Sequence, residues 1–265
     1  MAERKLGVDI ADLRLAVKDA IRTAAALEFS AVELPTTGEL APEHLSGSGR
    51  RHLGQFVRGF GLDLSALVAD ISGTRLTDSR TVDERVQRTC RIIELARDLH
   101  APVVTASAGA LTHPETGEPS ALAMEALRRI GEAADAQGVV YALRPSQDSG
   151  ERLQRVLDAL RCPCLQIGID PAAMVMAGAD PLAAIERVAD HIRLFHLRDG
   201  LAGLAERPGR ETRIGEGEID LVGLMTVLDA SQYRGPYILR RTDSASPVQD
   251  LRDGLEFIKR ESPGW

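Results

Sequence analysis

The sequence predicts an α/β fold in which one chain forms a single (β/α)8 barrel. Short apolar runs alternate with longer helical patterns along the whole 265-residue chain. Eight such pairs fit a closed barrel better than a two-domain protein. The apolar runs are mostly continuous, as expected for parallel strands that helices cover on the outer face. No linker, low-complexity segment or long-period repeat interrupts the pattern, so we expect one domain over residues 1–265.

The expected elements follow from the apolar runs and helical periods. Strands are expected at 5–10, 30–34, 62–71, 102–107, 139–143, 165–170, 192–196 and 237–241. Helices are expected near 13–27, 42–60, 81–99, 119–137, 149–161, 180–190, 220–231 and 247–260.

Local sequence chemistry supports two of these helices. Thr81 and Glu84 have the spacing of a capping box at the start of the third helix. Asp180 followed by Pro181 is typical of a cap and first helical position. The apolar stripe of the third helix is formed by Val82, Val86, Cys90, Ile93 and Ala96.

Composition and charge limit the possible partners. The formal net charge is −7 and aromatic residues make up 3% of the chain, which argues against nucleic-acid binding. No apolar stretch is long enough for a membrane helix, and the polar opening lacks the apolar core of a signal peptide. Cys90, Cys162 and Cys164 form no disulfide or zinc pattern, so we expect reduced, packed thiols in a cytoplasmic protein.

Polar residues at strand ends are the candidate functional groups, because active sites of such barrels lie at the carboxyl ends of the strands. Strand ends also carry caps and structural ion pairs, so their convergence on one rim matters more than any single residue. The candidates are Asp9, Glu33, Asp70, Ser107, Arg144, Asp170, His196, Arg240 and Arg241.

The second half of the chain carries a recognisable succession of motifs. A strand ends on Asp170 and leads through small residues to Asp180. The next strand contains His196, a glycine- and acid-rich segment follows at 215–220, and the last strand ends on Arg240. This order resembles the sugar phosphate isomerase/epimerase group of xylose isomerase-like TIM barrels. The resemblance covers roughly residues 139–260 well and the first half only through its strand and helix rhythm.

The resemblance implies a divalent-metal site, with glutamates ending strands five and eight, an aspartate ending strand six and a histidine on strand seven. Such oxygen and imidazole ligands suit Mn²⁺, Mg²⁺ or Co²⁺. In the family the metal polarises a sugar carbonyl while the glutamates shuttle a proton. Here the aspartate is Asp170 and the histidine is His196, but the glutamates are replaced by Arg144 and Arg240, and a further polar position is Ala173.

These replacements change the expected chemistry. Arginine stays protonated, so it serves neither as a cation ligand nor as a general base. A dication about 4 Å from one guanidinium would feel roughly 8 kcal/mol of repulsion at an effective dielectric near 20. Asp170 and His196 alone are too few ligands for tight binding. We therefore predict no metal cofactor, with a divalent ion such as Mn²⁺ on Asp170 and His196 as the alternative.

Three roles of the two arginines stay open from the sequence. They could pair with Asp170 in a catalytically silent barrel. They could form a clamp for a carboxylate or phosphate of a sugar-like ligand, helped by Arg241 or Arg213. A cation could instead bind through other carboxylates, namely Glu33, Asp70 or Asp199.

The expected function is that of an isomerase/epimerase-like barrel that binds a small anionic or sugar-like molecule, silently or with metal-free chemistry. The alternative is an active metal-dependent sugar isomerase or epimerase with altered ligands. Expected partners exclude nucleic acid and membrane, and a homodimer is possible. The predicted site has His196, Asp170 and Glu33 as catalytic residues and Arg144, Arg240, Arg241 and Asp70 as ligand-binding residues.

The long loop at 199–217 raises separate expectations. Asp199 is expected to cap or order the loop rather than act as a second base. The segment 215–220 lacks the lysine and hydroxyl of a phosphate loop and is interpreted as a turn and helix cap. The arginine-rich part at 207–213 is expected to be solvated and could cover the barrel mouth.

Overall fold

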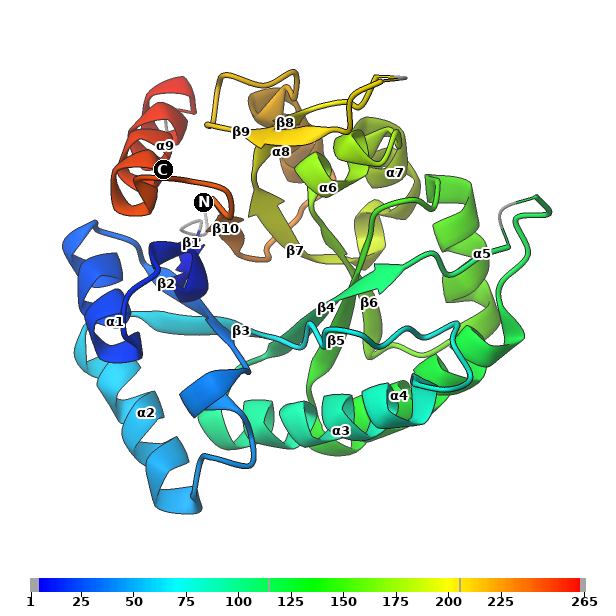
Figure 1. The fold of residues 1–265 in the computed structure, drawn as a ribbon, viewed down its shortest axis with the longest axis horizontal. Helices are drawn as coiled ribbons and strands as arrows, with labels where there is room; N and C mark the ends of the chain where they lie inside the picture. Colours follow the sequence, from blue (N-terminus) through cyan, green and yellow to red (C-terminus); the bar gives the residue numbers. More distant parts are fainter. Residues whose placement is uncertain (1–4, 114, 205, 263–265) are drawn as a thin grey trace.

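The computed structural model describes residues 5–113, 115–204 and 206–262, and it has the expected closed barrel (Figure 1). Eight strands follow one another around the barrel in the order β1-β10-β7-β6-β5-β4-β3-β2, and every neighbouring pair is parallel. Helices surround the strands on the outside. The α/β class and the (β/α)8 architecture are thus confirmed.

The barrel strands are short. They are β1 (Leu6–Asp9), β2 (Ala31–Pro35), β3 (Asp63–Val68), β4 (Val103–Gly109), β5 (Val140–Pro145), β6 (Leu165–Ile169), β7 (Ile192–Leu197) and β10 (Tyr237–Leu239). The helices are α1 (Val17–Ala26), α2 (Gly47–Gly59), α3 (Val82–Leu99), α4 (Ala121–Gln137), α5 (Gly150–Leu160), α6 (Pro171–Met176), α7 (Pro181–Val188), α8 (Leu221–Ala230) and α9 (Pro247–Glu261). The described residues also form the short 3-10 turns η1 (Ile10–Leu13), η2 (Gly38–Leu40) and η3 (Ala189–His191).

The structure adds elements that the sequence pattern did not predict. Helix α6 follows β6 directly, because Asp170 accepts a hydrogen bond from Ala173 N and Pro171 occupies the first turn. The long loop contains an antiparallel pair, β8 (Asp199–Leu201) and β9 (Arg210–Thr212). These pieces are too short to give a periodic apolar signal.

The two expected helix starts have different outcomes. Asp180 accepts hydrogen bonds from Leu182 N and Ala183 N, so the predicted cap of α7 is confirmed. The capping box at Thr81 is wrong, because the Thr81 side chain makes no bond to its own helix and accepts from Arg75 N instead. The Thr81 hydroxyl, which would cap the helix, thus accepts a hydrogen bond from the preceding loop.

Strand alternation decides what lies inside the barrel. An inner apolar cluster is formed by Ala66, Val103, Ala142, Leu194 and Ile238. Since side chains on a strand point the same way every second residue, the next inward positions follow two residues later, and four of these five are polar while the fifth is Val68. The inner apolar cluster therefore forms a floor beneath a polar layer at the carboxyl ends.

Two further expectations can be compared with the described residues. Cys90, Cys162 and Cys164 are free and half-buried. No helix within the described ranges has both the length and the apolar character required to cross a membrane.

Candidate functional site

Three strands carry an apolar residue of the floor and, two positions later, a polar residue of the layer above. The pairs are Ala142 with Arg144, Leu194 with His196, and Ile238 with Arg240. Both arginines that replace the family's expected glutamates therefore point into the carboxyl end of the barrel. Their side chains are only 9% and 11% exposed.

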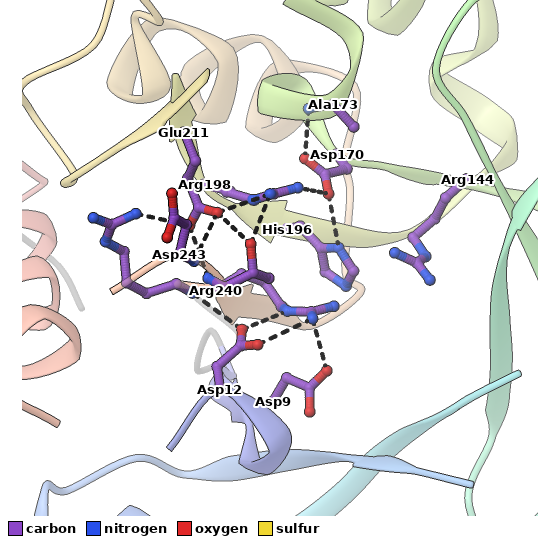
Figure 2. A network of polar contacts seen from close by, with 12 residues as sticks. Asp9, Asp12, Arg144, Asp170, Ala173, His196, Arg198, Glu211, Arg240 and Asp243 are labelled. Carbon is purple, nitrogen blue, oxygen red and sulfur yellow. Dashed lines mark hydrogen bonds and ion pairs between the residues drawn. The ribbon is translucent and has the colours of Figure 1, made fainter. Parts of the chain in front are cut away.

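The guanidinium of Arg240 lies beside the carboxylates of Asp9, at the end of β1, and Asp12, on η1 (Figure 2). Its Nε donates to Asp12 Oδ2 at 2.7 Å, and Nη2 lies 3.0 Å from Asp9 Oδ2. Its Nη1 lies 3.7 Å from Glu33 Oε2. Burial would lower the pKa of Arg240, but Asp9 and Asp12 outweigh this and hold it well above its usual value. The guanidinium is therefore a fixed positive charge in the barrel mouth.

The histidine lies between two carboxylates. His196 Nε2 is 3.1 Å from Glu33 Oε2, and Nδ1 is 3.6 Å from Asp170 Oδ2. The second distance is too long for a hydrogen bond, so His196 Nδ1 has no hydrogen-bond partner, and neither does Glu33 Oε1. The side chains of His196 and Glu33 are fully buried.

A second guanidinium, that of Arg198, holds Asp170. Arg198 Nη1 is 3.1 Å from Asp170 Oδ2, while Nη2 donates to Glu211 Oε2 at 2.8 Å. Burial alone would raise the pKa of Asp170, but contact with His196 and the charge of Arg198 hold it far below its usual range. Asp170 is therefore a permanent carboxylate that also caps α6.

Asp9 differs from the other carboxylates of the site. Burial raises its pKa from 3.8 to about 7, opposed by Arg240 and reinforced by the nearby charges of Glu33 and Asp12. For Glu33, burial acts in the same direction, but His196 and Arg240 outweigh it and lower the pKa. Asp9 is thus the carboxyl of this layer that changes charge near neutral pH.

Arg144 has a separate partner. Its Nη2 donates to Asp70 Oδ2 at 2.5 Å, and its Nε donates to Thr105 Oγ1 at 3.1 Å. A glycine on β6 leaves room for this side chain, because a Cβ at Gly168 would lie 3.0 Å from Arg144 Cγ. Asp70 itself has a side chain that is 44% exposed.

One of the three roles left open by the sequence, the pairing of Arg144 and Arg240 with Asp170, is wrong. Neither arginine contacts that carboxylate, because Arg240 is held by Asp9 and Asp12, and Arg144 by Asp70. Arg198, which directly follows β7 and lies two residues after His196, binds Asp170 instead.

Arg241 and Arg213 both pair with a carboxylate of α9. Arg241 Nε and Arg213 Nε each lie 3.0 Å from a carboxylate oxygen of Asp250. Arg241 also lies 3.3 Å from Glu211. The structure therefore does not bring these two arginines together with Arg144 and Arg240.

The loop aspartate behaves as expected. Asp199 is buried and accepts hydrogen bonds from the backbone N–H groups of Gly215, Gly217 and Ile219. Gly217 is needed there, because a Cβ would lie 2.0 Å from Asp199 Oδ1. Asp220 caps α8, which confirms the turn-and-cap interpretation of 215–220.

Part of the arginine-rich segment is not a solvated flap. Its residues Glu211 and Thr212 are buried in β9. Glu211 binds Arg198 and also accepts from Thr242 N at 2.9 Å. This segment therefore belongs to the wall of the site.

A cavity of about 430 Å³ lies beside the buried layer, at the carboxyl ends of β3, β4 and β5. Asp70, Arg85, Ser107 and Gln147 are among its lining residues. Asp70 joins the cavity to the buried layer through its ion pair with Arg144. Its volume suits a small polar ligand of sugar size.

Sequence reasoning missed several residues of this site. Asp12 lies on η1, Arg198 directly precedes the long loop, Glu211 lies within that loop on β9, and Arg85 lies on α3. A search restricted to strand ends omits all four. Arg85 did have a signal, because it is a charged residue three positions after Val82 on the inward face of an apolar helix stripe.

The donor set does not fit a divalent cation. Across the described ranges, no group of three His, Cys, Asp or Glu side chains is arranged to hold a metal ion. The nearest carboxylates, those of Asp9, Asp12 and Glu33, surround a guanidinium instead.

Comparison with known proteins places the chain in a family. Residues 21–261 match the model of the xylose isomerase-like TIM barrel family, and the chain belongs to that family. No curated protein sequence matches it.

Solved structures share the fold at low identity. A xylose isomerase domain protein from Planctomyces limnophilus is 20% identical with a TM-score of 0.84, over 97% of this chain and 95% of that one. A xylose isomerase-like TIM barrel protein from Mycobacterium smegmatis in complex with magnesium is 14% identical, with a TM-score of 0.75 over 98% and 96%. A sugar phosphate isomerase/epimerase from Parabacteroides distasonis is 13% identical, with a TM-score of 0.72 over 100% and 96%. These similarities establish the fold alone.

Proposed function

We propose that this chain is a sugar isomerase/epimerase-like barrel in which a guanidinium replaces the divalent cation, and that it binds a small sugar-like or anionic molecule without metal. One observation carries the proposal, namely the Arg240 guanidinium held by Asp9 and Asp12 and close to Glu33. A cation arriving there would have to displace a buried charge from its partners.

Electrostatics supports this assignment. At about 4 Å and an effective dielectric near 20, one guanidinium opposes a dication by roughly 8 kcal/mol. Arg144 and Arg198 add positive charge beside Asp70 and Asp170. The carboxylates that could attract a metal are thus already neutralised by side chains of the chain itself.

Burial supports binding without chemistry. His196 and Glu33 are fully covered, so a ligand in the cavity meets Asp70, the carboxylate that Arg144 binds, rather than the histidine. We propose the cavity at β3–β5 as the ligand site. The predicted catalytic roles of His196, Asp170 and Glu33 stay a prediction.

A second candidate is metal-free proton transfer. It is favoured by the two buried atoms that lack hydrogen-bond partners, His196 Nδ1 and Glu33 Oε1. A general acid and a general base both need an atom that is free to exchange a proton with the substrate. This function would require that a substrate displace Arg198 from Asp170 and Arg240 from Glu33.

The test restores the family's expected carboxylates. In the variant Arg144→Glu with Arg240→Glu, added Mn²⁺ should raise the unfolding temperature and bind in calorimetry, because two new ligands then join Asp170 and His196. Wild-type protein should show neither effect and should contain no stoichiometric metal by elemental analysis. The control variant, Arg22→Glu with Arg128→Glu, changes the net charge equally on exposed helix faces.

Stoichiometric manganese, zinc or cobalt that survives dialysis of the wild type would contradict the proposal. It would favour the alternative, a metal-dependent isomerase or epimerase with altered ligands. A wild type that turns over aldose and ketose sugars only after Mn²⁺ addition would have the same meaning.

A further inference from the structure

The wall of the cavity contains a buried arginine without a carboxylate partner. Arg85 lies in the first turn of α3, and the residue is only 5% exposed. Its Nη1 donates to the carbonyl of Thr74 at 3.0 Å, and its Nη2 donates to the carbonyl of Ser107. No ion pair joins it to an acidic side chain within the described ranges, and its Nε has no partner.

This arrangement is unusual because a buried charge is costly unless an opposite charge or a ligand compensates it. The helix position adds to the cost, since the amino end of a helix already carries partial positive charge. The one carboxylate that lines the cavity near Arg85, that of Asp70, is bound by Arg144. The two backbone carbonyls hold the guanidinium in place but do not neutralise it.

The surroundings of Arg85 indicate a positive cavity. Arg75 also lines it from an exposed position. For Asp70, burial would raise the pKa, but Arg144 outweighs it and lowers the pKa, so the carboxylate stays ionised and engaged. Arg75 and Arg85 thus line the cavity together with one carboxylate, Asp70, which is already paired with Arg144.

We infer that the cavity takes a hydroxylated small-molecule anion, a sugar acid or sugar phosphate, with Arg85 as the electrostatic anchor for its charged group. This rests on the proposed function, because it names the ligand class for the same site. Ser72, Thr77 and Gln147 supply exposed hydroxyl and amide groups for the ligand's own hydroxyls. The anionic group of the ligand supplies the negative counter-charge that Arg85 lacks.

Calorimetric titration with glucuronate, glucose phosphate and glucose at matched ionic strength tests the inference. At least one anion should bind more tightly than glucose, and Arg85→Gln should reduce that affinity by roughly ten- to a hundredfold, since a charge-assisted contact is lost. Arg85→Lys should retain part of the affinity. The stronger of the two anions identifies the charged group as a carboxylate or a phosphate.

Two further variants control for the loss of any arginine from α3 and for misfolding of Arg85→Gln. Arg91→Gln removes an exposed arginine from the same helix outside the cavity and should leave binding unchanged. If Arg85→Gln fails to fold, Arg75→Gln on the exposed rim should still weaken anion binding severalfold.

The inference is overturned if glucose binds as tightly as both anions or if folded Arg85→Gln retains full anion affinity. It is also overturned if neither anion raises the unfolding temperature of the wild type at about 10 mM. Metal analysis of the same preparation separates the two ideas. Stoichiometric metal would contradict the proposed function. A metal-free protein that binds neither anion would contradict only the role of Arg85.

Discussion

The carboxyl end of the barrel contains two polar regions that differ in how their charges are balanced. In the buried layer, Arg240 faces Asp9 and Asp12, and little of the group is exposed. In the cavity next to it, Arg85 faces backbone carbonyls and a cavity of about 430 Å³. In the first region the guanidinium is paired with carboxylates, and in the second the one lining carboxylate, Asp70, is paired with Arg144 and not with Arg85. The comparison shows that the charges of the buried layer are balanced by the chain's own side chains, whereas Arg85 beside the cavity has no carboxylate partner within the described ranges.

The largest expected effect comes from Arg240→Met. Removal of this guanidinium leaves Asp9, Asp12 and Glu33 buried together without their shared counter-charge. We expect a loss of about 3–5 kcal/mol in the free energy of unfolding, measured by urea denaturation.

The matched control for this loss is Arg128→Met. Arg128 makes exposed ion pairs with Glu125 and Glu132 on α4. Such pairs contribute about 0–1 kcal/mol, so the control should change little. Equal losses in the two variants would mean that the buried layer is not an ionic core.

A pH effect of intermediate size is expected for Asp9→Asn. Folded Asp9 keeps its proton up to a pKa of about 7, whereas the unfolded chain releases it near 3.8. The folded state therefore binds more protons between these values, and wild-type stability falls as the pH rises through this window. The asparagine variant lacks this contribution, so the stability of the wild type relative to the variant should fall from pH 4 to pH 7 and then level off.

Urea denaturation at a series of pH values measures this difference. Asp63→Asn is the control, because Asp63 is exposed and pairs with Lys5 at the amino end of β3. A difference that stays constant or rises with pH would show that Asp9 is ionised in the folded protein throughout.

The smallest of the three effects is expected for Arg144→Met. Its partner Asp70 is 44% exposed, so water can solvate the carboxylate once the guanidinium is gone. We expect a loss of about 1–2 kcal/mol, much of it from the lost hydrogen bond to Thr105. A loss as large as that of Arg240→Met would erase the distinction between the buried layer and the cavity edge.

Much of the fold could be predicted because its signals are local. Each barrel strand is a short apolar run, and the helices α3 and α9 carry clear periodic stripes. Strand counting also placed Arg144 and Arg240 at the ends of the fifth and eighth barrel strands, and both point into the barrel. That step needs only the alternation of side chains on a strand.

The partners of these arginines could not be predicted in the same way. Asp12 lies after β1 on a 3-10 turn, and Arg198 lies in the loop after β7. Which carboxylate each guanidinium reaches depends on the stagger of neighbouring strands and on side-chain length, and neither is local in sequence. Pairing of Asp170 with Arg240 was one of the possible roles, but Arg198 binds this carboxylate instead.

The contact between Arg240 and Asp12 joins residues 228 positions apart. It forms only where β10 closes against β1, the seam that makes the sheet continuous. A nascent chain still missing residue 240 therefore holds acidic groups in its first strands with no arginine to neutralise them, which opposes their premature burial. The guanidinium of Arg240 and the strand that closes the barrel are therefore synthesised together, near the end of translation.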